Sequence, residues 1–134
     1  MADLADKLNE VMADEWACVR ALRRAEPLCD DPGKKEVIKR VRKDCSINCV
    51  NLANVIRALG GRPTDIPSAR FSQKTADETL ADCLELTQSV QERVIAEIDK
   101  LVDEAEAKAH RDVLLLVREL HVTDIRWMKS VGPD

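Results

Sequence analysis

Apolar residues recur at alternating intervals of three and four positions along four separate stretches of this chain. This spacing is typical of helices that bury one face against antiparallel neighbours. The stripes run from Leu4 to Leu22, from Ile38 to Leu59, from Leu80 to Leu101 and from His110 to Val131. Four such stripes predict an all-α fold, an antiparallel four-helix bundle, and 134 residues fit a single domain spanning 1–134.

Glycine, proline and capping residues set the expected helix boundaries. Asp3 is a candidate N-cap of the first helix and Pro27 is expected to end it. Asp31 or a neighbour caps the second helix, and Gly60 supplies the left-handed residue after it. The third helix is expected to start near Thr75, where T-A-D-E has the spacing of a capping box. The predicted helices span residues 3–26, 34–59, 76–102 and 107–131.

Two connections matter for the topology. A turn is expected around residues 103–107, because one helix from 76 to 131 would exceed the usual length and the apolar stripe changes phase there. Residues 62–75 contain two prolines and are expected to lack long regular structure. Fully extended, this segment could reach ~45 Å, enough to cross the ~39 Å length of a ~26-residue helix. A bundle with one long crossover is therefore possible.

Each apolar stripe is interrupted by polar residues or cysteine near its middle. The pattern alternates between a single residue and a pair separated by three positions. A buried polar group without a partner costs a few kcal/mol, so four interruptions at one depth indicate side chains that face one another. The six residues are Glu15, Cys45, Asn48, Gln91, His121 and Asp124.

This arrangement resembles the ferritin-like superfamily, whose di-iron bundles carry one Glu on the first and third helices and Glu-x-x-His on the second and fourth. Glu15 matches the first Glu, Cys45 and Asn48 stand at the first pair, Gln91 at the third-helix Glu, and His121 and Asp124 at the last pair. The segments LNEVMADEWA, IRALGGRP and RFSQKTAD also resemble small bacterial ferritin-like proteins akin to rubrerythrins. The resemblance covers nearly the whole chain.

Most ligand identities depart from that family. A di-iron centre of this type requires about four carboxylates and two imidazoles, whereas this layer offers two carboxylates and one imidazole. We therefore expect no cofactor, no ferroxidase-type activity, and a metal-free layer in which amides and His121 hydrogen-bond Glu15 and Asp124. Such a protein would serve a binding or structural role. The alternative is a metal-binding protein or oxidoreductase with a single divalent ion, Zn or Fe, on Glu15, Cys45, His121 and Asp124.

Composition bounds the partners. Aromatic residues make up 2% of the chain and the net charge is −4, which argues against nucleic-acid binding. No run of about 18 apolar residues exists, so we expect no membrane partner. The acidic N-terminus is unlike a signal peptide, and five scattered cysteines favour free thiols in the cytoplasm. We also expect a homodimer or larger homo-oligomer.

Three further interpretations stay open at this point. Cys45 and Cys49, with Cys18, could form a soft metal site, although free cysteines are commonly small hydrophobic core residues and we favour that role. His110 is expected to be an exposed or capping residue. The two tryptophans, Trp16 and Trp127, could anchor a subunit contact or cover the ends of the bundle.

Overall fold

The computed structural model describes residues 3–71 and 78–131, and within these ranges it contains helices and no strands. The four long helices are α1 (Leu4–Leu28), α2 (Pro32–Ala58), α3 (Leu80–Leu101) and α4 (Lys108–Lys129). Two short 3₁₀ turns, η1 (Ala69–Phe71) and η2 (Val102–Glu104), precede α3 and α4. The expected four-helix bundle is confirmed.

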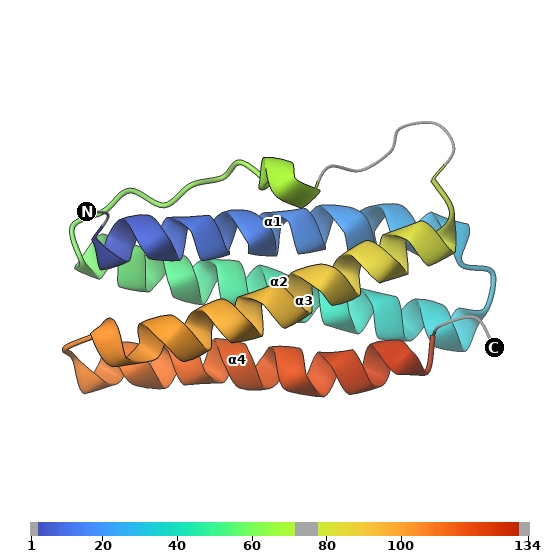
Figure 1. The fold of residues 1–134 in the computed structure, drawn as a ribbon. Helices are drawn as coiled ribbons and strands as arrows, with labels where there is room; N and C mark the ends of the chain where they lie inside the picture. The colour runs from blue at the N-terminus through green and yellow to red at the C-terminus, as the bar shows by residue number, and fades with distance from the viewer. Residues whose placement is uncertain (1–2, 72–77, 132–134) are drawn as a thin grey trace.

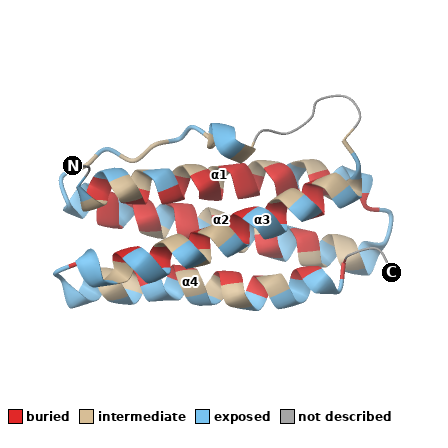
Figure 2. Ribbon diagram, viewed as in Figure 1, coloured by how far each residue is buried: buried red, intermediate tan, exposed pale blue. Residues whose placement is uncertain are grey.

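The helices lie side by side around one apolar core. Both α1 and α4 pack mainly against α2 and α3. The α2–α3 connection carries the chain back along α1, so every neighbouring pair of helices is antiparallel (Figure 1). Buried residues line the inward faces of all four helices (Figure 2). None of the helices in the described part of the chain has an apolar stretch long enough to cross a bilayer.

The first two helices have the caps that their sequences predict. The Asp3 side chain accepts a hydrogen bond from the Asp6 amide, and Asp31 accepts one from Lys34. These caps satisfy amide groups that have no partner inside the helix. Gly60 follows α2 with φ of +86°, a left-handed conformation that glycine adopts without a Cβ clash.

Two predicted boundaries are wrong. Pro27 does not end α1 but lies inside its last turn, and the helix runs on to Leu28. In the third helix, Thr79 and Asp82 form the capping box, and α3 starts at Leu80. The sequence T-A-D-E-T-L-A-D offers two capping patterns in a row, and the second directly precedes the buried stripe. Thr75, the expected start, lies outside the described residues.

The expected break between the third and fourth helices is confirmed. The chain leaves α3 through η2, and Ala105 and Ala107 then adopt extended backbone conformations before α4. Ala105 is buried at this corner. The phase change in the apolar pattern, rather than any glycine or proline, marks this turn in the sequence.

The described part of the α2–α3 connection, residues 59–71, is fastened along α1. Asn9 donates from Nδ2 to the Arg62 carbonyl at 2.9 Å and accepts from the Thr64 amide at 2.8 Å. The Trp16 indole donates to the Thr64 carbonyl at 2.9 Å. Further along, the Ser68 amide donates to the Ala13 carbonyl at 2.9 Å. Apart from η1 the described segment has no regular structure, as expected.

Candidate functional site

The six residues that interrupt the stripes are buried in the bundle interior. Glu15 lies on α1, Gln91 on α3, and the two pairs on α2 and α4. None of the six exceeds 1% exposure. The complete set is Glu15, Cys45, Asn48, Gln91, His121 and Asp124. The 3-and-4 periodicity of each helix therefore places these residues on the core face, as the sequence predicts.

A hydrogen-bonded group joins three helices at the centre of this layer. His121 Nε2 is hydrogen-bonded to the Glu15 carboxylate, and Asn48 Nδ2 lies 3.4 Å from the same ring nitrogen. A carboxylate only accepts, so Nε2 carries the hydrogen and donates to Glu15. The Asn48 amide nitrogen is also a donor, so the Asn48 amide has to turn and present its oxygen to His121 if the two are to form a hydrogen bond. In the described structure this oxygen has no other partner.

Many other polar atoms of the layer lack a hydrogen-bond partner among the described residues. They belong to both carboxylates, the imidazole and both amides, and are Glu15 Oε2, Asn48 Oδ1, both polar atoms of the Gln91 amide, His121 Nδ1 and both Asp124 oxygens. The amides and His121 are expected from the sequence to satisfy both acids. His121 does so for one oxygen of Glu15, whereas Glu15 Oε2 and both oxygens of Asp124 find no partner among the described residues. Gln91 makes no hydrogen bond to the other five residues.

Burial disfavours the charged form of the Asp124 carboxyl. Burial raises its pKa to about 8, and the neighbouring Asp44 carboxyl contributes to the increase. Arg40 lowers the pKa of Asp124 and Glu15 raises it. Asp44 lies close enough for its negative charge to disfavour the charged form of Asp124. Neither oxygen of Asp124 has a hydrogen-bond partner in the described structure. A metal ion bound here at neutral pH would therefore have to displace the Asp124 proton.

Two thiols meet beside the layer. Cys18 Sγ on α1 lies 3.1 Å from Cys45 Sγ on α2. Their contact lowers the pKa of Cys18, but burial and the carboxylates of Glu15 and Asp124 leave it raised. Contact with Cys18 and burial hold the pKa of Cys45 well above its ordinary value. All five cysteines are buried and none forms a disulfide. Cys18 and Cys45, with their raised pKa values, stay protonated and behave as core residues.

A second buried acid, Asp14, does not interrupt an apolar stripe, so the sequence pattern misses it. Its side chain is 1% exposed and faces Arg93 of α3 at 3.4 Å and Arg70 of the connection at 3.9 Å. Burial raises its pKa, and Ser68 and the two arginines oppose that effect. Asp14 lies beside Glu15 in sequence but on a different face of α1. It ties the connection and α3 to α1.

The tryptophans and His110 lie away from the layer. Trp16 holds the connection from the middle of α1, so it does not cover an end of the bundle, and its expected role in a subunit contact stays a prediction. Trp127 is 39% exposed, and the Arg40 guanidinium stacks 4.7 Å from its ring centroid. A subunit contact through Trp127, and with it the homodimer, stays a prediction. His110 is half-buried in the first turn of α4.

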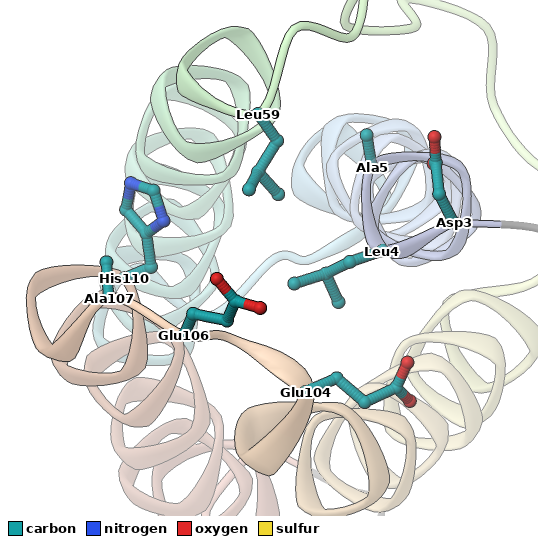
Figure 3. Close-up of a pocket in the computed structure, with 8 residues that line it drawn as sticks. All are labelled: Asp3, Leu4, Ala5, Leu59, Glu104, Glu106, Ala107 and His110. Atoms are coloured by element: carbon teal, nitrogen blue, oxygen red, sulfur yellow. The ribbon is translucent and has the colours of Figure 1, made fainter.

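One end of the bundle has an opening. A cavity of about 360 Å³ lies where α1 begins, α2 ends and the α3–α4 turn passes (Figure 3). Leu4 and Leu59 project into it, and Glu106 and His110 approach from the α4 side (Figure 3). None of the six layer residues lines this cavity, so it offers no direct opening onto the layer.

Comparison with known proteins supports the fold. A crystal structure described as "ferritin like, diiron-carboxylate proteins" from Bacillus anthracis str. Ames superposes with a TM-score of 0.74, covering 96% of this chain and 91% of that one. This chain has the ferritin-like fold. The two sequences are 21% identical, a likeness that extends to the fold alone. No family model matches this chain, and no curated protein matches it either.

The residues of the buried layer do not fit a di-iron-carboxylate centre. They supply two carboxyl groups, a single imidazole and two amides, and amides are poor iron ligands. Glu15 and His121 are hydrogen-bonded to each other. In the described part of the chain, no group of three or more His, Cys, Asp or Glu side chains is arranged to hold a metal ion.

Proposed function

We propose that this ferritin-like bundle is a binding or structural module whose centre is a hydrogen-bonded polar layer in place of a di-iron site. The observation that carries the proposal is the donor set of the buried layer: Glu15 is hydrogen-bonded to His121, burial raises the pKa of Asp124 to about 8, and amides stand at Asn48 and Gln91. Such a layer lacks the negative charge that would balance two iron ions.

Iron loading of untagged protein tests this proposal. Protein mixed aerobically with Fe(II) and then desalted should retain less than one iron atom per chain. Two retained iron atoms per chain would refute the proposal.

A variant with restored donors provides the control. Cys45→Glu, Asn48→His and Gln91→Glu together bring the layer close to the ferritin-like pattern of Glu and Glu-x-x-His. This variant should retain more iron than the wild type if the missing donors are the cause. Helical circular dichroism of the same samples identifies a variant that fails to fold.

A second candidate is a single divalent ion on Glu15, Cys45, His121 and Asp124. The observation in its favour is the set of unpartnered oxygens on Glu15 and Asp124. Zn(II) would have to displace the Asp124 proton and the Cys45 proton, so its binding should release protons and strengthen with pH. Isothermal titration of chelator-treated protein with Zn(II) at pH 6 and pH 8, in two buffers of different ionisation enthalpy, separates this candidate from the metal-free layer.

A further inference from the structure

A second cavity lies on the outside of the bundle, in the groove between α1 and α2. Its volume is about 590 Å³, within the usual ~300–1,000 Å³ range of small-molecule sites. Met12 and Trp16 of α1 form one side of the groove, and Val50 and Ala53 of α2 form the other. None of the six layer residues lines the groove, so a ligand bound there would be independent of whatever the layer holds.

The third wall of this groove is held in place by specific contacts. Residues 62–65 of the connection border the cavity. Asn9 binds the backbone of Arg62 and Thr64, and the Trp16 indole binds the Thr64 carbonyl. A loop anchored at these two points keeps its side chains over the groove, so the cavity is largely formed before any ligand arrives.

Two arginines line this cavity. Arg57 comes from the last turn of α2 and Arg62 from the wall. Among the described residues, neither Arg57 nor Arg62 takes part in an ion pair, unlike Arg24, Arg42, Arg70, Arg93 and Arg118. Asp65 is the acidic residue in the lining, so the charges at the mouth sum to one positive charge. A groove that combines apolar side chains with a net positive charge complements a molecule with an apolar body and one anionic head.

We propose that the α1–α2 groove binds an amphipathic carboxylate, with its hydrocarbon chain against Met12, Trp16, Val50 and Ala53 and its carboxylate on Arg57 and Arg62. Guanidinium binds a carboxylate through paired charge-assisted hydrogen bonds. The apolar walls remove the hydrocarbon chain from water, which supplies most of the non-directional affinity.

Trp16 provides a direct readout. In a Trp127→Phe background, Trp16 is the sole tryptophan, and its fluorescence can be titrated with decanoate below its micelle concentration. We expect a saturable change with decanoate. Decanol lacks the charge and inorganic phosphate lacks the chain, so each should bind at least about tenfold more weakly, the equivalent of one charge-assisted hydrogen bond or a few methylenes.

Two variants test the assignment of residues. Arg57→Gln with Arg62→Gln should weaken decanoate binding by about tenfold or more. The matched control, Arg23→Gln with Arg126→Gln, removes two exposed arginines elsewhere and should leave binding unchanged. Val50 is 61% exposed, so Val50→Asp should weaken decanoate binding without disturbing the core.

Three results would overturn the proposal: no saturable change with decanoate, equal binding of decanol or phosphate, or equal loss in both arginine pairs. Unchanged helical circular dichroism in each variant makes these outcomes conclusive.

Discussion

Helix α1 faces two polar environments that differ in how well they are satisfied. On its outer face, Asn9 and Trp16 make full hydrogen bonds to the connection at 2.8–2.9 Å. On its inner face, Glu15 is hydrogen-bonded to His121 through one oxygen, and its other oxygen has no partner among the described residues. The better-satisfied groups are the ones that water could have reached, and the poorly satisfied ones are fully buried.

This difference indicates that the outer and inner faces of α1 have different roles. Contacts that hold the connection contribute to stability, because each donor meets an acceptor at good geometry. A buried layer with unpartnered atoms costs stability, and apolar side chains of similar volume would pack there without that cost. Glu15, His121 and Asp124 are therefore not explained by stability, which leaves binding or specificity of packing as their physical role.

The largest expected effect comes from replacing the charged part of the layer. Glu15→Leu, His121→Leu and Asp124→Leu together should be neutral or should raise the free energy of unfolding, by up to about 4 kcal/mol, because both buried carboxyl groups are removed together with the His121 donor, and among the remaining layer residues only Asn48 loses a contact, the long one at 3.4 Å. Urea unfolding followed by circular dichroism measures the change. A loss of more than about 2 kcal/mol would mean that the layer stabilises the bundle after all, and the contrast between the two faces would disappear.

Removal of His121 alone should lower the free energy of unfolding, in contrast to the triple replacement. His121→Leu leaves the Glu15 carboxylate buried without its donor and should lower the free energy of unfolding by about 1–3 kcal/mol. Leu114→Ile, a volume-conserving change in the same helix, controls for general core disturbance. If His121→Leu is no worse than this control, Glu15 does not depend on His121.

Asp124 should make stability depend on pH. Its pKa is raised from 3.8 to about 8 in the folded state, so the native protein binds a proton that the unfolded chain has released. Stability should then fall as pH rises from about 4 to about 8. Asp124→Asn should remove this dependence and stabilise by about 1–2 kcal/mol at pH 8 relative to wild type, and by less at pH 5. Parallel unfolding curves at pH 5 and pH 8 check the sign.

The smallest effect is expected on the outer face. Asn9→Ala loses both hydrogen bonds to the connection and should destabilise by about 0.5–1.5 kcal/mol, the usual net value where water can substitute. Asn54→Ala, at an exposed position of α2, is the matched control. Hydrogen exchange of the Thr64 amide should quicken in Asn9→Ala and stay unchanged in the control.

The sequence determines much of this fold because periodicity and caps are local signals. The stripe spacing gives the core faces, Gly60 gives the end of α2, and the phase change near residue 103 gives the last turn. Pro27 misleads as an end signal because a proline in a last turn removes one hydrogen bond without stopping the helix there. The start of α3 is ambiguous in the sequence because Thr75 and Thr79 begin equivalent capping patterns.

The candidate site, like the fold, has some features that the sequence predicts and others that it does not. Burial of all six layer residues follows from the stripes, whereas the partners each one finds do not. The Cys18–Cys45 contact, the pairing of Asp14 with Arg93 and the anchoring of the connection by Trp16 join residues distant in sequence. Helix rotation and the path of the connection decide these contacts, and no short pattern encodes either.

The central claim is that a metal-free polar layer occupies the centre of this ferritin-like bundle. Thermal unfolding of the wild type and of the triple Leu variant at positions 15, 121 and 124, each with chelator and with Zn(II) or Fe(II), tests it most directly. Metal that binds the native state raises the melting temperature in proportion to its affinity. We predict matching wild-type midpoints with chelator and with metal. A wild-type midpoint that rises by several degrees with metal, while that of the triple variant does not move, would contradict the claim.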